Sequence, residues 1–155
     1  MGLDMFLIKK PYVYRYPTEK DDDNAPKLTI KYPGVKPERV TYIEERIGIW
    51  RKANAIHQWF VDNVQDGEDD CRPYYTSIDD LKKLRDAVSR VLANRSLARE
   101  LLPTQGGFFF GSLDYDQYYF DDLKLTQEIC DLAINEDRAI PGKPGDGEYY
   151  YEASW

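Results

Sequence analysis

Alternating apolar and polar positions predict strands at both ends of the chain. Residues 3–9 alternate loosely and contain Leu, Phe and Ile, and residues 148–154 contain three tyrosines. Pro11 interrupts the first run, so a continuation through 12–16 would be a separate segment. Shorter runs of the same character predict further strands at 28–32, 39–49, 74–76 and, between glycines, 106–111. Segments rich in Asp, Pro and Gly predict loops at 18–26 and 141–147.

From Trp50 onward the apolar positions recur at helical spacing. Residues 51–65 are therefore predicted to form a helix, which ends at Asp66 and Gly67. The opposite face of this helix is rich in amides and carries Arg51, Asn54, Gln58, Asp62 and Gln65. We expect the apolar face to pack inward and the amide-rich face to stay available for a ligand.

Two further helices follow the same logic. Ser77 is a favourable N-cap with two acids in the next turn, so it begins a second helix that runs to about Asn94. A short helical turn at 96–102 ends at Pro103, and a third helix is predicted over 116–135. The inner side of the third helix is expected to carry Tyr118, Leu125, Ile129 and Leu132.

The order of these elements predicts a single α+β domain over residues 1–155. Strands at both ends with helices between them favour an antiparallel sheet of about four to six strands packed with about three helices. No internal repeat and no linker divides the chain.

Charge and composition restrict the partners. The 155 residues carry a formal charge of −7, which argues against general nucleic-acid binding. The mean hydropathy is −0.68, and no apolar run is long enough to span a membrane. No export signal precedes the two cysteines, so we expect reduced thiols in a cytoplasm. The charge is uneven, at +4 for residues 27–52 and −7 for residues 103–137, which can orient a ligand or partner.

Arg51 and Lys52 open the first predicted helix, where backbone N–H groups and the helix dipole favour an anion. With the Asn54 amide they would form a phosphate or carboxylate site, and Gln58 lies on the same face. The alternative is that the two cations pair with nearby acids, namely Glu44, Glu45 or Asp62.

His57, the single histidine, falls near the middle of the apolar stripe. Such a histidine is either a hydrogen-bonded core residue or a general acid or base that works near neutral pH. The sequence leaves both interpretations open.

Clustered carboxylates follow the first helix. Asp66, Asp69 and Asp70 could supply oxygen ligands for Ca²⁺ or Mg²⁺, although their crowding does not match a twelve-residue calcium loop. The alternative is a solvated turn that ends the helix, and we expect no cofactor.

A glycine- and phenylalanine-rich segment offers a third candidate site. Glycines in 106–111 allow close backbone approach, and the three phenylalanines are predicted to belong to the core. Gln105 precedes this segment, and Asp114, Tyr115 and Tyr118 follow it at a predicted strand-to-helix junction. A tyrosine exposed there could stack on a base or another ring.

The chain resembles a family of uncharacterised proteins of phages, prophages and their bacterial hosts. The resemblance lies in the opening MGLDM, in RKANAIHQWFVDNVQDGEDDC over 51–71, in LLPTQGGFFFGS over 101–112, in Tyr115 and Tyr118, and in the tyrosine-rich end at Trp155. It carries no activity over to this chain. It implies a small accessory protein, and such proteins often modulate a host system, including host defence.

Two functions follow as hypotheses. The first is a binding protein that captures a host protein or a small anionic, nucleotide-like ligand. The second is a small metal-assisted phosphoester hydrolase that uses His57 and a group of carboxylates, namely Asp66, Asp69, Asp70, Asp114 and Asp116.

Overall fold

The computed structural model describes residues 2–11, 13, 28–138 and 148–155. Its four strands form one antiparallel sheet in the order β2-β1-β4-β3. These strands are β1 (Asp4–Lys9), β2 (Glu45–Arg51), β3 (Tyr74–Thr76) and β4 (Tyr149–Ser154). The chain ends are thus neighbours in the sheet, because β1 pairs with β4 along its whole length. The predicted α+β class is confirmed.

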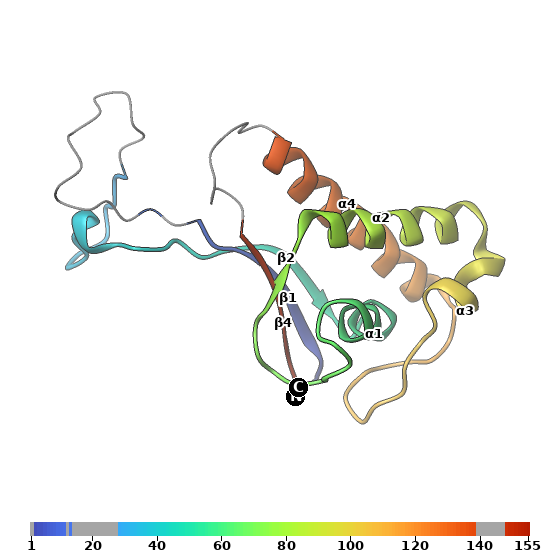
Figure 1. The fold of residues 1–155 in the computed structure, drawn as a ribbon. Helices are drawn as coiled ribbons and strands as arrows, with labels where there is room; N and C mark the ends of the chain where they lie inside the picture. The colour runs from blue at the N-terminus through green and yellow to red at the C-terminus, as the bar shows by residue number, and fades with distance from the viewer. Residues whose placement is uncertain (1, 12, 14–27, 139–147) are drawn as a thin grey trace.

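The helices lie between the strands in sequence (Figure 1). They are α1 (Asn54–Asn63), α2 (Ile78–Ala93), α3 (Ala98–Leu101) and α4 (Gln117–Arg138), with single 3₁₀ turns η1 (Pro37–Arg39) and η2 (Arg95–Leu97). The Ser77 cap is confirmed, because its hydroxyl accepts from the Asp80 N–H while the Asp80 carboxylate accepts from the Ser77 N–H. No helix among the described residues is long and apolar enough to cross a membrane.

The helices pack on one face of the sheet. Burial alternates along β4, where Tyr149, Tyr151 and Ala153 are buried and the residues between them are partly exposed. Phe60 of α1 stacks on Tyr151 at 3.9 Å between ring centroids. Trp50 of β2 donates a hydrogen bond from Nε1 to Thr126 of α4. The core therefore lies between this sheet face and helices α1 and α4.

Helix α1 begins three residues later than predicted. Arg51 is still in the sheet, opposite Asp4, so it does not open the helix. Lys52 has a φ of 60°, which ends the strand in the left-handed region and turns the chain toward α1. The predicted start is wrong because Trp50 belongs to the apolar pattern of a strand, and the helix begins only at Asn54, after the cap residue Ala53.

Two predicted strands are wrong. Residues 28–32 contain no strand, and the segment 28–44 reaches away from the sheet with η1 at its far end (Figure 1). Residues 106–111 form a turn rather than a buried strand. The physical reason is that the Phe110 and Ser112 carbonyls accept hydrogen bonds from the side-chain amide of Asn54 and not from the backbone of a neighbouring strand. The predicted strand at 39–49 is shifted to Glu45–Arg51, with an isolated bridge at Tyr42.

The predicted core positions of the last helix are partly wrong. Ile129 is buried, but the exposed fractions of Tyr118, Leu125 and Leu132 are 81%, 38% and 44%. Helix α4 instead buries Leu123, Thr126, Cys130 and other residues, because it packs against both α2 and the sheet. The predictions at 12–16, 18–26 and 141–147 lie mainly or wholly outside the described residues.

Candidate functional site

A cavity of about 390 Å³ opens where three segments meet. The end of β2 and the start of α1 form one wall, from Arg51 to Ile56. Part of the loop between α3 and α4 forms the second wall, and the first two turns of α4 form the third. Four of the residues predicted as ligand contacts line this cavity, namely Arg51, Lys52, Asn54 and Tyr118.

The cationic wall is held by an unusual backbone. The backbone φ angle of Lys52 is 60°, in the left-handed region that residues other than glycine seldom adopt. Its N–H donates to the Leu3 carbonyl at 2.7 Å, and its carbonyl accepts from the Asn54 N–H at 2.9 Å. Gly111 lies directly against it, because a Cβ at Gly111 would be 3.2 Å from the Lys52 Cβ. Such strain is often found at functional sites.

Few acidic side chains of the described chain pair with Arg51 and Lys52. Arg51 meets Asp4 at 3.4 Å, and its side chain is 74% exposed, so the interaction is weak. The predicted alternative partners, Glu44, Glu45 and Asp62, do not pair with Arg51. Within the described parts of the chain, Lys52 forms no ion pair. Lys52 can therefore receive an anion, whereas the Arg51 side chain leaves β2 on the same face of the sheet as Ile49 and stands at the rim of the cavity.

The N-terminus of α1 also faces this cavity. Ala53 stands at the cap position and has no side chain that can accept a hydrogen bond. The backbone N–H groups of Ala55 and Ile56, both on the cavity wall, have no acceptor within the described chain. Arg51, Lys52 and these two N–H groups form what we call the anion corner.

Asn54 does not present its amide to a ligand. It is 4% exposed, and its Nδ2 donates to the Phe110 and Ser112 carbonyls at 2.9 Å each. Its Oδ1 accepts from the Gln105 N–H at 3.0 Å. The expectation of an open amide-rich face is thus wrong for Asn54, and also for Gln65, which is 1% exposed. Asn54 fixes the loop that closes the cavity.

Carboxylates from α4 and the preceding loop stand on the opposite side. Asp116 accepts from the Tyr119 N–H and caps α4, and Asp114 is exposed on the rim. Asp122 is only partly exposed, and no described residue donates to its carboxylate. Burial, followed by the charges of Asp121 and Asp116, raises the pKa of Asp122 to about 6. A hydrogen-bond donor on a ligand would stabilise its charged form.

The tyrosines near the cavity differ in role. Tyr118 is 81% exposed and lines the cavity, so its ring is available for stacking. Tyr119 is buried and donates its hydroxyl hydrogen to the Leu102 carbonyl. Tyr115 accepts from the Thr104 N–H and packs edge-on against Tyr119, so it supports the loop instead of lining the cavity.

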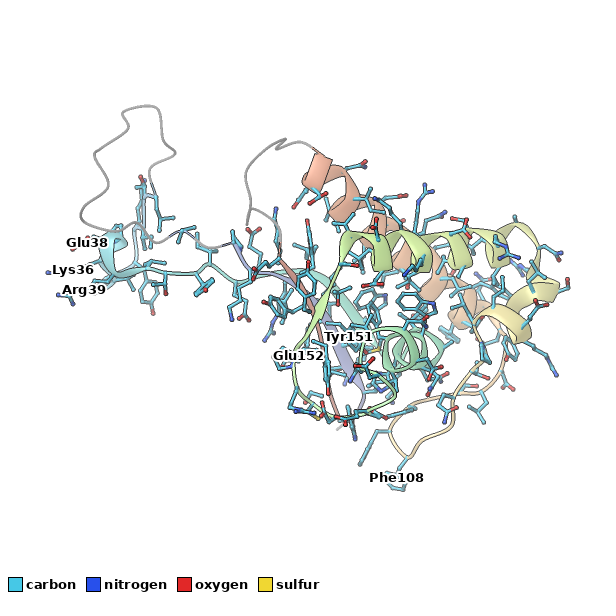
Figure 2. All side chains as sticks on the ribbon, viewed as in Figure 1. Lys36, Glu38, Arg39, Phe108, Tyr151 and Glu152 are labelled. Atoms are coloured by element: carbon cyan, nitrogen blue, oxygen red, sulfur yellow. The ribbon has the colours of Figure 1, made fainter. Side chains whose placement is uncertain are left out.

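The phenylalanine-rich loop divides its three rings. Phe110 is buried edge-on against His57, Phe109 is half-buried, and Phe108 is 95% exposed. Figure 2 shows Phe108 at the tip of the loop, pointing away from the rest of the protein. The prediction that all three belong to the core is wrong for Phe108, because the loop turns there and packs the Phe110 ring against Gly107, where a Cβ would lie 2.7 Å from that ring.

His57 lies in the core and not in the cavity. It is 0% exposed, and its Nδ1 and Nε2 lie 2.7 Å from the Tyr151 hydroxyl and 2.9 Å from the Asp69 carboxylate. Because a carboxylate only accepts, Nε2 carries the hydrogen and Nδ1 accepts from Tyr151. Burial lowers the pKa of His57, against an opposing effect of Asp69. The hydrogen-bonded core interpretation describes this residue.

The remaining candidates are separated from one another. Gln58 donates to Asp62 on the surface of α1. Asp69 is bonded to His57, whereas Asp70 pairs with Arg72 at 2.6 Å, and this arginine with its hydrogen bonds lowers the pKa of Asp70. Among the described residues, no three or more His, Cys, Asp or Glu side chains are placed to hold a metal ion.

Sequence reasoning missed Asp122 and the first-turn N–H groups. The sequence holds no signal for Asp122, because its partial burial arises only in the folded chain. The first-turn N–H groups can be identified only when the first residue of α1 is known. The sequence predicts that start too early, because Trp50 fits the apolar pattern of a helix as well as that of a strand.

Comparisons of the chain with protein-family profiles, with curated proteins and with solved structures give no match. The site therefore has to be interpreted from its own geometry and chemistry.

Proposed function

We propose that the protein is a non-enzymatic binding protein that captures a nucleoside monophosphate whose base carries an amino group. The observation that carries this proposal is the anion corner, where two cationic residues and two N–H groups that have no acceptor among the described residues line one cavity of about 390 Å³. A cavity of this size is within the range that holds small ligands.

The phosphate fits the anion corner. An uncapped helix N-terminus presents N–H groups and a favourable dipole to an anion. Arg51 adds a planar fork of donors and Lys52 adds a compact positive charge. Three carboxylates on the other walls disfavour a ligand as highly charged as a triphosphate, so a monophosphate agrees better with the cavity.

The base fits the opposite side. The exposed Tyr118 ring offers a stacking surface, which binds any base. The Asp122 carboxylate lacks a donor from the described chain, and an exocyclic amino group would supply one. Adenine carries such a group at C6, and hypoxanthine carries a carbonyl there.

Binding agrees with the geometry better than catalysis does. The hydrolase alternative requires His57 and several carboxylates at one point, but His57 is buried between Tyr151 and Asp69. No specific observation favours that alternative. On the resemblance to phage and prophage proteins, we further propose that the protein is an accessory protein that modulates a host system, including host defence.

A thermal-shift comparison of AMP with IMP tests the proposal. At about 5 mM AMP, a dissociation constant near 0.5 mM would raise the melting temperature by about 4 °C. We expect AMP to stabilise the wild type more than IMP does. Arg51→Ala should lose the response to both nucleotides, and the matched variant Arg39→Ala, altered in the distant turn η1, should keep it.

Two outcomes would contradict the proposal. One is the absence of stabilisation by AMP, CMP and GMP. The other is an equal response of Arg51→Ala and the wild type, which would place any binding outside the anion corner.

A further inference from the structure

Helix α4 carries a second apolar stripe that the fold leaves open. Tyr118, Leu125 and Leu132 are spaced seven residues apart and are 81%, 38% and 44% exposed. This spacing places them on one side of the helix, each about 10.5 Å beyond the last. We call these three residues the α4 seam. Leu125 and Leu132 do not line the cavity.

The seam is separate from the side of α4 that builds the core. Leu123, Thr126, Cys130 and Ala133 are 0% exposed and face the rest of the protein. An apolar pattern with a period of seven on an exposed helix face is typical of a surface that packs against another helix. A helix that covers the seam from Tyr118 to Leu132 needs about four turns.

The acidic residues of the seam indicate the charge of the partner. Asp121 and Glu128 lie between the three apolar residues and are both exposed. Asp121 is paired with Lys124 at 3.1 Å, whereas Glu128 has no ion pair within the described chain. Helix α4 contains six acidic and two basic residues in all. A second copy of α4 would bring like charges together, and a basic helix would bring opposite charges together.

We infer that the α4 seam is a docking site for a basic amphipathic helix of a partner protein. Apolar residues of the partner pack against Leu125 and Leu132, and its lysines or arginines meet Asp121 and Glu128. This inference does not rest on the nucleotide, because only Tyr118 belongs to both surfaces.

A designed peptide tests the docking site. The probe is a fluorescein-labelled helical peptide of about 20 residues, made of Leu, Lys and Ala with its leucines on one side. A second peptide has the same composition, with its leucines distributed around the helix. Fluorescence anisotropy with the full-length protein should show micromolar binding of the first peptide and binding weaker by about tenfold or more for the second.

Matched protein variants locate the binding. Leu125→Asp combined with Leu132→Asp should weaken binding by about tenfold, although the added negative charge alone would strengthen the attraction. Ile49→Asp combined with Tyr75→Asp, which adds the same charge on the open face of the sheet, should change it by less than about twofold. Circular dichroism checks that both variants are folded.

Three results would overturn the inference. The first is no binding of the amphipathic peptide at about 100 μM. The second is equal binding of the two peptides by the wild type, or equal binding of the amphipathic peptide by the two double variants. The third is a dimer of the wild type, seen by light scattering and lost in the Leu125→Asp, Leu132→Asp variant, which would assign the seam to a second copy.

Discussion

Two buried or half-buried ionisable side chains respond to their surroundings in different ways. His57 is hydrogen-bonded on both nitrogens and belongs to the core, whereas Asp122 receives no hydrogen bond on its carboxylate from the part of the chain that the structure describes and lines the cavity. Burial disfavours the charged form of each, so it lowers the pKa of the histidine and raises the pKa of the carboxyl group. A satisfied group is more typical of a structural role, and an unsatisfied one of a binding role.

The titration of His57 should have its midpoint below pH 6.5. The folded state resists protonation, so stability from this residue is present above the unfolded pKa and declines as the pH falls below it. The Cε1–H signal of the single histidine reports this directly by NMR. The same signal in urea is the control, and a folded midpoint above the urea value would show that Asp69 outweighs burial.

Asp122→Asn should stabilise the protein at alkaline pH. The carboxyl pKa rises from 3.8 to about 6 on folding, so the ionised form costs stability above pH 6 and the cost declines as the pH falls. We expect a gain of about 1–2 kcal/mol near pH 8, after allowance for screening, and less than half of that near pH 4.5. Urea unfolding at both pH values measures it. A gain independent of pH would contradict the raised pKa.

At the scale of elements, one amide joins α1 to the loop after α3. The Asn54 side chain donates hydrogen bonds to the Phe110 and Ser112 carbonyls and accepts one from the Gln105 N–H. The loop in turn places Gly111 against Lys52 and so shapes the cavity. The loop is therefore held by a side chain where a strand would use its backbone.

Asn54→Ala should lower the free energy of unfolding by about 2–4 kcal/mol, because it leaves three backbone groups without their partner. Gln58→Ala is the matched control, since its amide bonds only to Asp62 at the surface, and it should change stability by about 0.5 kcal/mol or less. Urea unfolding compares the two variants. Equal losses would show that the loop is not held by Asn54.

Elements with a local signal could be predicted from the sequence. The strands at both ends follow from alternation, and α2 follows from its Ser77 cap and apolar period. The start of α1 was missed because Trp50 fits both a strand and a helix. The seam residues Tyr118, Leu125 and Leu132 were placed inside because period alone does not tell which of two apolar stripes meets the core.

At the scale of the whole molecule, the cavity depends on contacts between distant parts of the chain. Arg51 ends a strand, Gly111 belongs to a loop, and Asp122 lies in the last helix. Arg51, Lys52 and Tyr118 could be named from the sequence, because their chemistry alone marks them. Asp122 could not be named, because its partial burial arises only when the first turns of α4 meet the end of β2 and the start of α1 around the cavity.

Chemical-shift mapping with AMP tests the binding proposal most directly. In ¹⁵N-labelled protein, AMP should shift the amide signals of Ala55 and Ile56 strongly as they donate to the phosphate, together with those of Lys52 and Asp122. Signals of the distant η1 turn should stay unchanged. Unchanged Ala55 and Ile56 signals at millimolar AMP, or shifts only outside the cavity, would contradict the account.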